Sequence, residues 1–233
     1  MKRFTLCLLF VVSLNALYAQ YNAFMIPDYG SIKKEIADTN SKYFYPKLLE
    51  RYNSLDTTFT LNEFRRFYYG FVFQTNYQPY WTSPYQKELE KYYKTSRIDP
   101  KDYDAIIDLA AKSVKSFPFD IDNLYALSYL FHLKSDEATA KKYKTLAHLI
   151  FQTILSSGDG RTEESAFHVI SVTHEYRVLQ AFGYTSEQQS LIQGKSGACD
   201  YLELADNNEK VKGIYFNVEQ LFKKNSEMFK NLN

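Results

Sequence analysis

Few residues of this chain have the types and spacing that catalysis needs. The candidates are one thiol and two imidazoles in the last third of the sequence, Cys199, His168 and His174. A cysteine with a nearby histidine can act as a nucleophile and its base. A lone cysteine without a surrounding signature is weak support for such a role, and His168 alternates with apolar neighbours as a packed residue would. A structural role is therefore the first interpretation, and the nucleophile is the alternative.

No spacing in the sequence predicts a metal or cofactor site. His168 and His174 lack an HExxH motif or a cysteine pair beside them, whereas zinc needs three or four converging ligands. The turn Gly158-Asp159-Gly160 lacks the Lys-Ser/Thr step of a phosphate-binding loop. Glycoside hydrolysis needs two facing carboxylates, and nothing in the linear order of 27 acidic residues singles out such a pair. We therefore expect no cofactor and no metal.

The segment FRRFYYGFVFQTNYQPYW, residues 64–81, is unusually rich in aromatic rings. On a helix begun by Thr60, the apolar side chains form one broad stripe, which is typical of a helix packed between others. The stripe consists of Leu61, Phe64, Phe67, Tyr68, Phe71 and Val72. Tyr69 lies on a separate face beside Arg65, so it is the ring of this helix that we retain as a candidate for binding.

The loop QTNYQPYW, residues 74–81, places three rings outside the helical period. If they are exposed, Tyr77, Tyr80 and Trp81 could stack on a sugar or grip a peptide, with Pro79 stiffening the loop. The simpler interpretation is that they fill the gap between two helices. The exposure of each ring in the structure distinguishes these interpretations.

Residues 1–19 have the pattern of a secretory signal peptide. A positively charged start precedes a short apolar run, and the small residue Ala19 stands at the expected cleavage point. The run is shorter than the ~20 apolar residues that cross a bilayer, and no second run follows, so we expect no integral membrane segment after cleavage. Cleavage also removes Cys7, which leaves Cys199 alone and excludes an internal disulfide.

The charge balance argues against polyanionic partners. The chain has 28 Lys and Arg against 27 Asp and Glu, and cleavage would remove Lys2 and Arg3. A nucleic-acid-binding protein usually shows a basic excess, so we expect no nucleic-acid partner. With 45% apolar residues, the mature chain is long enough to bury a sizeable core as one or two domains.

Residues 20–157 have helical periodicity with frequent start signals, among them the capping-box spacing of Thr60 and Glu63. Apolar stripes at i, i+3 and i+4 follow these signals. Helix starts are expected near Pro46, Thr60, Ser83, Asp99, Asp122 and Asp136. Short loops favour antiparallel neighbours, so we predict helical hairpins of the tetratricopeptide kind, although no clean 34-residue repeat is present.

The pattern changes over residues 158–233. The run AFHVISV suits a strand, Thr173 suits the cap of a helix that ends at Gly183, and CDYLELA and KGIYFNV suit a hairpin around DNNEK. We therefore predict a strand, a helix and a hairpin packed against the helical part. The expected fold class is α+β, mainly α.

Three longer stretches carry a family resemblance. Their markers are Tyr68-Tyr69-Gly70, the Gly-Asp-Gly turn followed by AFHVIS, Glu175-Tyr176, and the final GIYFNV. With these markers the chain resembles the domain-of-unknown-function family 4919, an exported family chiefly of Bacteroidota, over residues 46–218. The resemblance implies a Gram-negative envelope setting and a helical part joined to a small β part. It implies no activity, and no functional residue is carried over.

The function expected is that of a non-enzymatic exported protein that binds a peptide, protein or glycan in the cell envelope. The expected location is the periplasm of a Gram-negative bacterium, with a secreted or surface location as the alternative. The absence of a catalytic signature and the concave surfaces that helical hairpins present both favour binding. The alternative is a hydrolase of envelope polymers that uses Cys199 or a carboxylate of the C-terminal region. A third hypothesis is a structural subunit whose exposed rings are buried in an oligomer.

Overall fold

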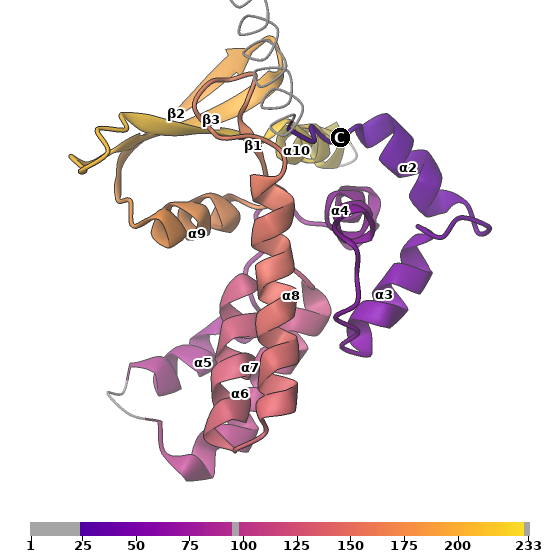
Figure 1. The fold of residues 1–233 in the computed structure, drawn as a ribbon, viewed down its shortest axis with the longest axis vertical. Coiled ribbons are helices and arrows are strands. Elements are labelled where there is room, and N and C mark those ends of the chain that lie inside the picture. Colours follow the sequence, from indigo (N-terminus) through magenta and orange to yellow (C-terminus); the bar gives the residue numbers. More distant parts are fainter. Residues whose placement is uncertain (1–23, 95–97, 231–233) are drawn as a thin grey trace, which may run out of the picture.

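The computed structural model of the chain describes residues 24–94 and 98–230, with side chains described through residue 226. It is a mixed α+β protein in which a bundle of helices lies against one side of a four-stranded sheet (Figure 1). The predicted signal peptide, residues 1–19, lies outside the described residues. None of the helices in the described ranges has both the length and the apolarity to span a membrane.

The N-terminal helices pack around the aromatic segment. They are α2 (Tyr29–Ala37), α3 (Tyr45–Asn53) and α4 (Leu61–Gly70), followed by the 3₁₀ turn η1 (Phe71–Phe73). The predicted capping box is confirmed: the Glu63 amide donates to the Thr60 hydroxyl, and the Thr60 amide donates to the Glu63 carboxylate at 2.8 Å. This pairing satisfies amides at the start of α4 that have no partner within the helix.

The middle helices form a layer of neighbours. They are α5 (Gln86–Tyr93), the 3₁₀ turn η2 (Pro100–Asp102), α6 (Tyr103–Ser116), α7 (Ile121–Leu133) and α8 (Glu137–Leu155). Asp136 caps α8 as predicted, because its carboxylate accepts from the Thr139 amide. Asp120, two residues before the predicted start, caps α7 in the same way. Figure 1 shows α6, α7 and α8 side by side.

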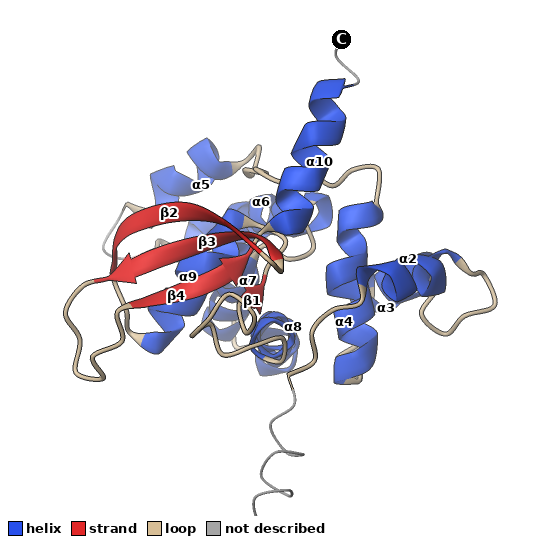
Figure 2. Ribbon diagram, turned by 90° about the horizontal axis from the view of Figure 1, so that it is seen from above, coloured by secondary structure: helices blue, strands red, loops and turns tan. Residues whose placement is uncertain are grey.

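The sheet has the strand order β1-β4-β3-β2. Its strands are β1 (Phe167–His168), β2 (Ser186–Gly194), β3 (Gly197–Leu204) and β4 (Gly213–Asn217). The hairpin β3–β4 is antiparallel as predicted, β2 pairs antiparallel with β3, and β1 pairs parallel with β4. Helix α9 (Val172–Phe182) lies beneath the sheet and α10 (Glu219–Lys230) follows β4 at one end (Figure 2).

The structure differs from two local predictions and adds two elements that were not predicted. The expected strand AFHVISV is reduced to the two residues of β1, because the chain begins α9 at Val172. Thr173 is therefore not the cap of α9, since Ser171 occupies the N-cap position. Strand β2 and helix α10 were not predicted from the sequence. Gly183 ends α9 as predicted, with a φ of 75° that glycine adopts without steric cost.

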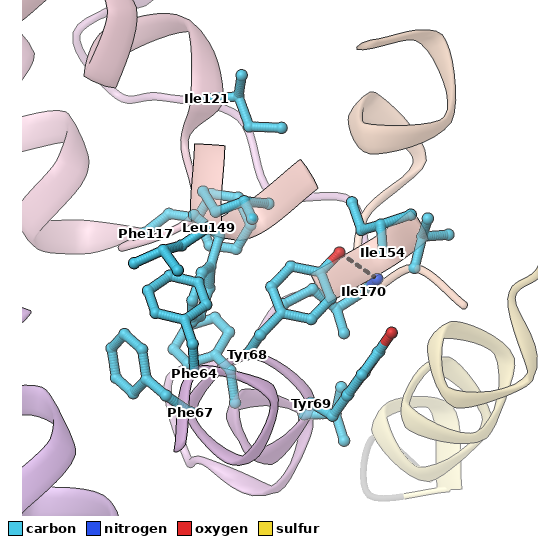
Figure 3. Packing of buried hydrophobic residues seen from close by; sticks show 14 of the residues in the cluster. Phe64, Phe67, Tyr68, Tyr69, Phe117, Ile121, Leu149, Ile154 and Ile170 are labelled. Atoms are coloured by element: carbon cyan, nitrogen blue, oxygen red, sulfur yellow. Dashed lines mark hydrogen bonds between the residues drawn. The ribbon is translucent and has the colours of Figure 1, made fainter. Parts of the chain in front are cut away.

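The rings of α4 form the centre of the hydrophobic core, as the stripe predicts. Phe64, Phe67, Tyr68 and Tyr69 are fully buried and project from α4 towards the other helices (Figure 3). The Tyr68 hydroxyl accepts from the amide of Ile170 at 3.4 Å. The same core contains apolar residues from both predicted regions, 20–157 and 158–233, so the helical part and the sheet share one interior.

Candidate functional site

Two adjoining clefts lie between α9 and the helices below it. The first, of about 480 Å³, is bordered by α5, the start of α7 and the start of α9. The second, of about 720 Å³, is bordered by α7, α8 and the end of α9. Both are lined by Ile121, Asp122 and Arg177, so together they form one elongated depression, which we call the α9 groove.

An ion pair crosses the middle of the groove. Arg177 on α9 donates to the carboxylate of Asp122 on α7 at 2.6 Å and to the Gln180 side chain at 2.6 Å. Both partners are partly exposed, so the pair adds little to folding stability. It instead places a planar donor group and a carboxylate where a bound molecule would contact both.

The first cleft has aromatic walls and an acidic floor. Trp81 packs on Phe117 with ring centroids 4.8 Å apart, and Tyr93 is 45% exposed. Burial, with the charges of Asp120 and Asp122, raises the pKa of Tyr93 to about 12. These carboxylates therefore lie near the tyrosine hydroxyl.

Asp120 is the most buried carboxylate of this cleft. It accepts from the backbone amide and side-chain amide of Asn123 and from the Ser113 hydroxyl. Burial raises its pKa above the ordinary value, although these hydrogen bonds oppose that shift. As the N-cap of α7, Asp120 has a structural role whether or not a ligand binds.

The second cleft is more apolar. The rings of Tyr125 and His148 meet edge to face with their centroids 6.1 Å apart, and Phe182 also lines this cleft. Tyr125, Leu155 and Phe182 are all exposed by more than a third. Both clefts of the groove therefore contain exposed aromatic rings as well as polar groups.

The structure separates the predicted aromatic candidates into two groups. Tyr69 and Tyr77 are buried, and their hydroxyls donate to the carbonyls of Thr153 at 3.1 Å and Ile170 at 3.0 Å. Both rings pack inside the core and leave no face exposed to a ligand. Trp81 lines the first cleft, whereas Tyr80 is 57% exposed outside both clefts.

The two candidate histidines are buried in the core. His174 accepts from the Tyr68 hydroxyl through Nδ1 at 2.7 Å and donates from Nε2 to the Phe119 carbonyl at 2.9 Å, which defines a neutral tautomer. Nδ1 of His168 has no hydrogen-bond partner among the described residues. Burial lowers the pKa of each imidazole to about 4.

Cys199 lies in one row of the sheet with His168. Cys199 on β3 and His168 on β1 are both paired with Asn217 on β4, so the three side chains project from the same face with Asn217 in the middle. No hydrogen bond joins Cys199 and His168 among the described residues; the thiol instead contacts the Asn217 amide at 4.0 Å. Burial first, then nearby carboxylates, raise the pKa of Cys199 to about 11, which disfavours the nucleophilic thiolate.

We expect native Cys199 to resist alkylation. At pH 8, a thiol with a pKa of about 11 is ionised roughly 100-fold less than a free cysteine, and its sulfur is also buried. Iodoacetamide labelling followed by mass spectrometry measures the rate in native and urea-unfolded protein. A native rate close to the unfolded one would show that the thiol is accessible and would return it to the catalytic candidates.

A pair of buried carboxyl groups lies between α9 and the sheet. Glu175 on α9 is fully buried, and neither of its oxygens has a partner among the described residues. Asp200 on β3 accepts from the Gln189 side chain at 2.7 Å, which in turn accepts from the Tyr176 hydroxyl at 2.9 Å. Burial, then the charge of Asp200, raises the pKa of Glu175 well above its ordinary value, so the fold favours the protonated form of this carboxyl.

Sequence reasoning missed both the groove and the carboxyl pair. An acidic residue in the first turn of a helix is common, so Glu175 carries no signal of burial. The groove residues come from α5, α7, α8 and α9, and only the tertiary fold brings them together. In the described ranges, no group of three or more His, Cys, Asp or Glu residues is arranged to hold a metal ion.

Comparison with known proteins gives one match. Neither a curated protein nor a solved structure matches the chain. The family model described as Domain of unknown function (DUF4919) matches residues 30–227, which is most of this chain. The chain therefore belongs to the DUF4919 family.

Proposed function

We propose that this chain is a non-enzymatic exported protein that binds a glycan chain in the α9 groove. The observation that supports the proposal is the groove itself, two adjoining clefts of about 480 and 720 Å³ that each contain an exposed aromatic ring. Each cleft has the volume of a small-molecule site, so two adjoining clefts accommodate more than one unit of a linear polymer.

The lining matches the chemistry of sugars. A sugar ring has an apolar C–H face, which stacks on an aromatic side chain, and a rim of hydroxyls that both donate and accept hydrogen bonds. Tyr93 and Tyr125 offer exposed rings in the first and second clefts. Between the rings, planar polar groups supply donors and acceptors. These groups are Gln86, Asp122, Asn123, Gln152, Arg177 and Gln180.

The lining favours a glycan over a peptide or a polyanion. An extended peptide commonly binds by joining a strand edge, and the residues that line the groove come from helices and loops and from none of the described strands. A helical peptide needs a continuous apolar trough, whereas the Arg177–Asp122 ion pair interrupts the lining that the two clefts share. Its carboxylates, from Glu90, Asp120 and Asp122, outnumber the cation of Arg177 and would repel a polyanion. The same acidic floor accommodates an amino sugar.

The setting and the finer architecture are parts of the same proposal. The pattern of residues 1–19 supports export. The family resemblance implies the envelope of a Gram-negative bacterium of the Bacteroidota, and within it we propose the periplasm. The tetratricopeptide-like arrangement of the helical part also stays a prediction. The rival hypothesis, a hydrolase of envelope polymers, has less support where it depends on Cys199, because the thiol is buried and protonated.

Groove variants test the proposal. An array of neutral and amino-sugar oligosaccharides identifies a ligand for the mature protein, and calorimetry then compares variants. Tyr93→Ala and Tyr125→Ala are each expected to weaken binding by about 10-fold or more, because each removes a stacking ring. Tyr129→Ala is the matched control, since Tyr129 is exposed on α7 but lines neither cleft.

The outcomes separate the alternatives. Binding that weakens in both groove variants and stays within about twofold in the control supports the proposal. Equal binding by all three variants would place the ligand elsewhere. Absence of any glycan ligand, with groove-dependent capture of members of a peptide library, would replace the glycan with a peptide. Release of shortened oligosaccharides during incubation would favour the hydrolase.

A further inference from the structure

Strand β2 is an open edge of the sheet. It is the last strand in the order β1-β4-β3-β2, and it pairs only with β3. At nine residues it is the longest strand of the described chain. The opposite edge, β1, has two residues. The sheet therefore exposes one long edge, which Figure 2 shows along its outer border.

The register identifies the backbone groups that face outward. The Val218 amide donates to the Ala198 carbonyl and the Leu204 amide to the Lys212 carbonyl, so even-numbered residues of β3 bond towards β4. Odd-numbered residues of β3 then bond towards β2, where their partners include Ser190 and Ile192. On β2, the amides and carbonyls of Gln189, Leu191 and Gln193 face away from the sheet. No hydrogen bond reaches these groups from the rest of the described chain.

This edge lacks the usual protection against pairing. Edge strands are commonly blunted by proline, by charged side chains or by short length. Between Gln188 and Gly194, β2 contains neither a proline nor a charged residue. Its one irregularity is the bulge near Ser186 and Gln188, at one end. Leu191, at the middle, is 56% exposed.

We propose that β2 pairs with β2 of a second copy, antiparallel and centred on Leu191, so that one continuous sheet runs through a symmetric dimer. A two-fold axis at Leu191 brings two exposed leucines together and places Gln189 opposite Gln193 of the other copy. Because outward-facing groups lie opposite one another, each such pair exchanges backbone hydrogen bonds. A symmetric dimer uses the same patch on both copies, as a single edge requires.

Charge complementarity identifies the occupant as a second copy. Glu187 and Lys195 flank the uncharged stretch at equal distances in sequence from Leu191. Antiparallel pairing about Leu191 brings Glu187 of one copy to Lys195 of the other at both ends. Neither residue forms an ion pair within the described chain, so both are free for this contact. A foreign strand would not need this self-complementary order.

Light scattering after size-exclusion chromatography tests the pairing. We expect a concentration-dependent dimer, and Leu191→Pro should raise its dissociation constant by about 100-fold or more. Proline there removes an outward amide but no hydrogen bond to β3, so circular dichroism should be unchanged. Tyr80→Ala, at a residue of similar exposure away from the edge, is the control and should dimerise as the native chain does.

Charge exchange provides a second test that does not depend on proline. Glu187→Lys or Lys195→Glu alone should weaken the dimer by roughly 3- to 10-fold, and the double variant should restore it. A native chain that stays monomeric up to about 0.5 mM would overturn the proposal. So would a dimer that a folded Leu191→Pro variant retains, or single-charge variants without effect.

Discussion

Replacing Phe119 with alanine is expected to lower the free energy of unfolding by about 3–5 kcal/mol, which is a large part of the stability of a typical domain. Phe119 stands in the loop that connects α6 to α7 and is fully buried. Its ring centroid lies 4.9 Å from that of Phe67, 5.1 Å from that of Tyr68 and 5.5 Å from that of Phe71. Alanine would leave a cavity that rigid rings on several sides cannot fill. Urea unfolding followed by tryptophan fluorescence and circular dichroism measures the loss.

The control for this prediction is Tyr129→Ala. Tyr129 is 56% exposed, so its truncation should change stability by less than about 0.5 kcal/mol. A Phe119→Ala variant as stable as this control would mean that the rings around Phe119 rearrange to fill the space.

The second large effect is expected at Glu175, where Glu175→Gln should stabilise the protein by on the order of 1–2 kcal/mol at pH 7. Glu175 is fully buried, and burial raises the pKa of its carboxyl well above the ordinary 4.5. The folded state therefore keeps a proton that the unfolded state has lost. Glutamine has a similar shape and no proton to retain.

The sign of the pH dependence follows from this shift. The contribution of Glu175 to the free energy of unfolding is fully present below pH 4.5. It is lost as the pH rises, by up to about 1.4 kcal/mol per pH unit. The advantage of Glu175→Gln should therefore grow from pH 4.5 upward. Urea unfolding at a series of pH values measures it. Glu203→Gln, at an exposed carboxylate on β3, is the control and should differ little from the native chain.

The buried histidines act in the opposite direction. The pKa values of His168 and His174 are lowered to about 4 in the fold. Below pH 6.5 these imidazoles therefore bind protons in the unfolded state that they do not bind in the folded state. Their contribution to stability is lost as the pH falls from 6.5 towards 4. Between pH 4.5 and 6.5 the histidines and Glu175 partly offset each other. From pH 6.5 to 8 the histidines no longer change the free energy of unfolding, so the effect of Glu175 can be measured alone. A difference in free energy of unfolding between Glu175→Gln and the native chain that stays constant over this range would contradict the prediction.

Helix positions could be predicted because their signals are local. The capping box of Thr60 and Glu63 and the Asp136 cap depend only on neighbours in sequence. Strand β2 gave no such signal, because SEQQSLIQG is an edge segment whose residues are mostly exposed and whose apolar alternation is lost. The AFHVISV run has strand propensity, but only Phe167 and His168 find a partner strand.

The candidate site was less predictable, because it depends on tertiary neighbours. Tyr77, Tyr80 and Trp81 occur together in a short loop, yet the first is buried, the second exposed and the third borders a cleft. Their environments are set by Ile170 and Phe117, which lie far away in sequence. Cys199 and His168 do lie in one row of the sheet, but sequence alone could not show that Asn217 lies between them.

The contact between Tyr68 and His174 has a consequence for biosynthesis. Its partners are 106 residues apart in sequence, and the Tyr69–Thr153 bond spans 84 residues. A chain that emerges from its N-terminus first therefore presents the aromatic face of α4 long before α9 and the sheet exist to cover it. Folding cannot be completed stepwise from that end, so a holding chaperone would have its longest period of action on this segment.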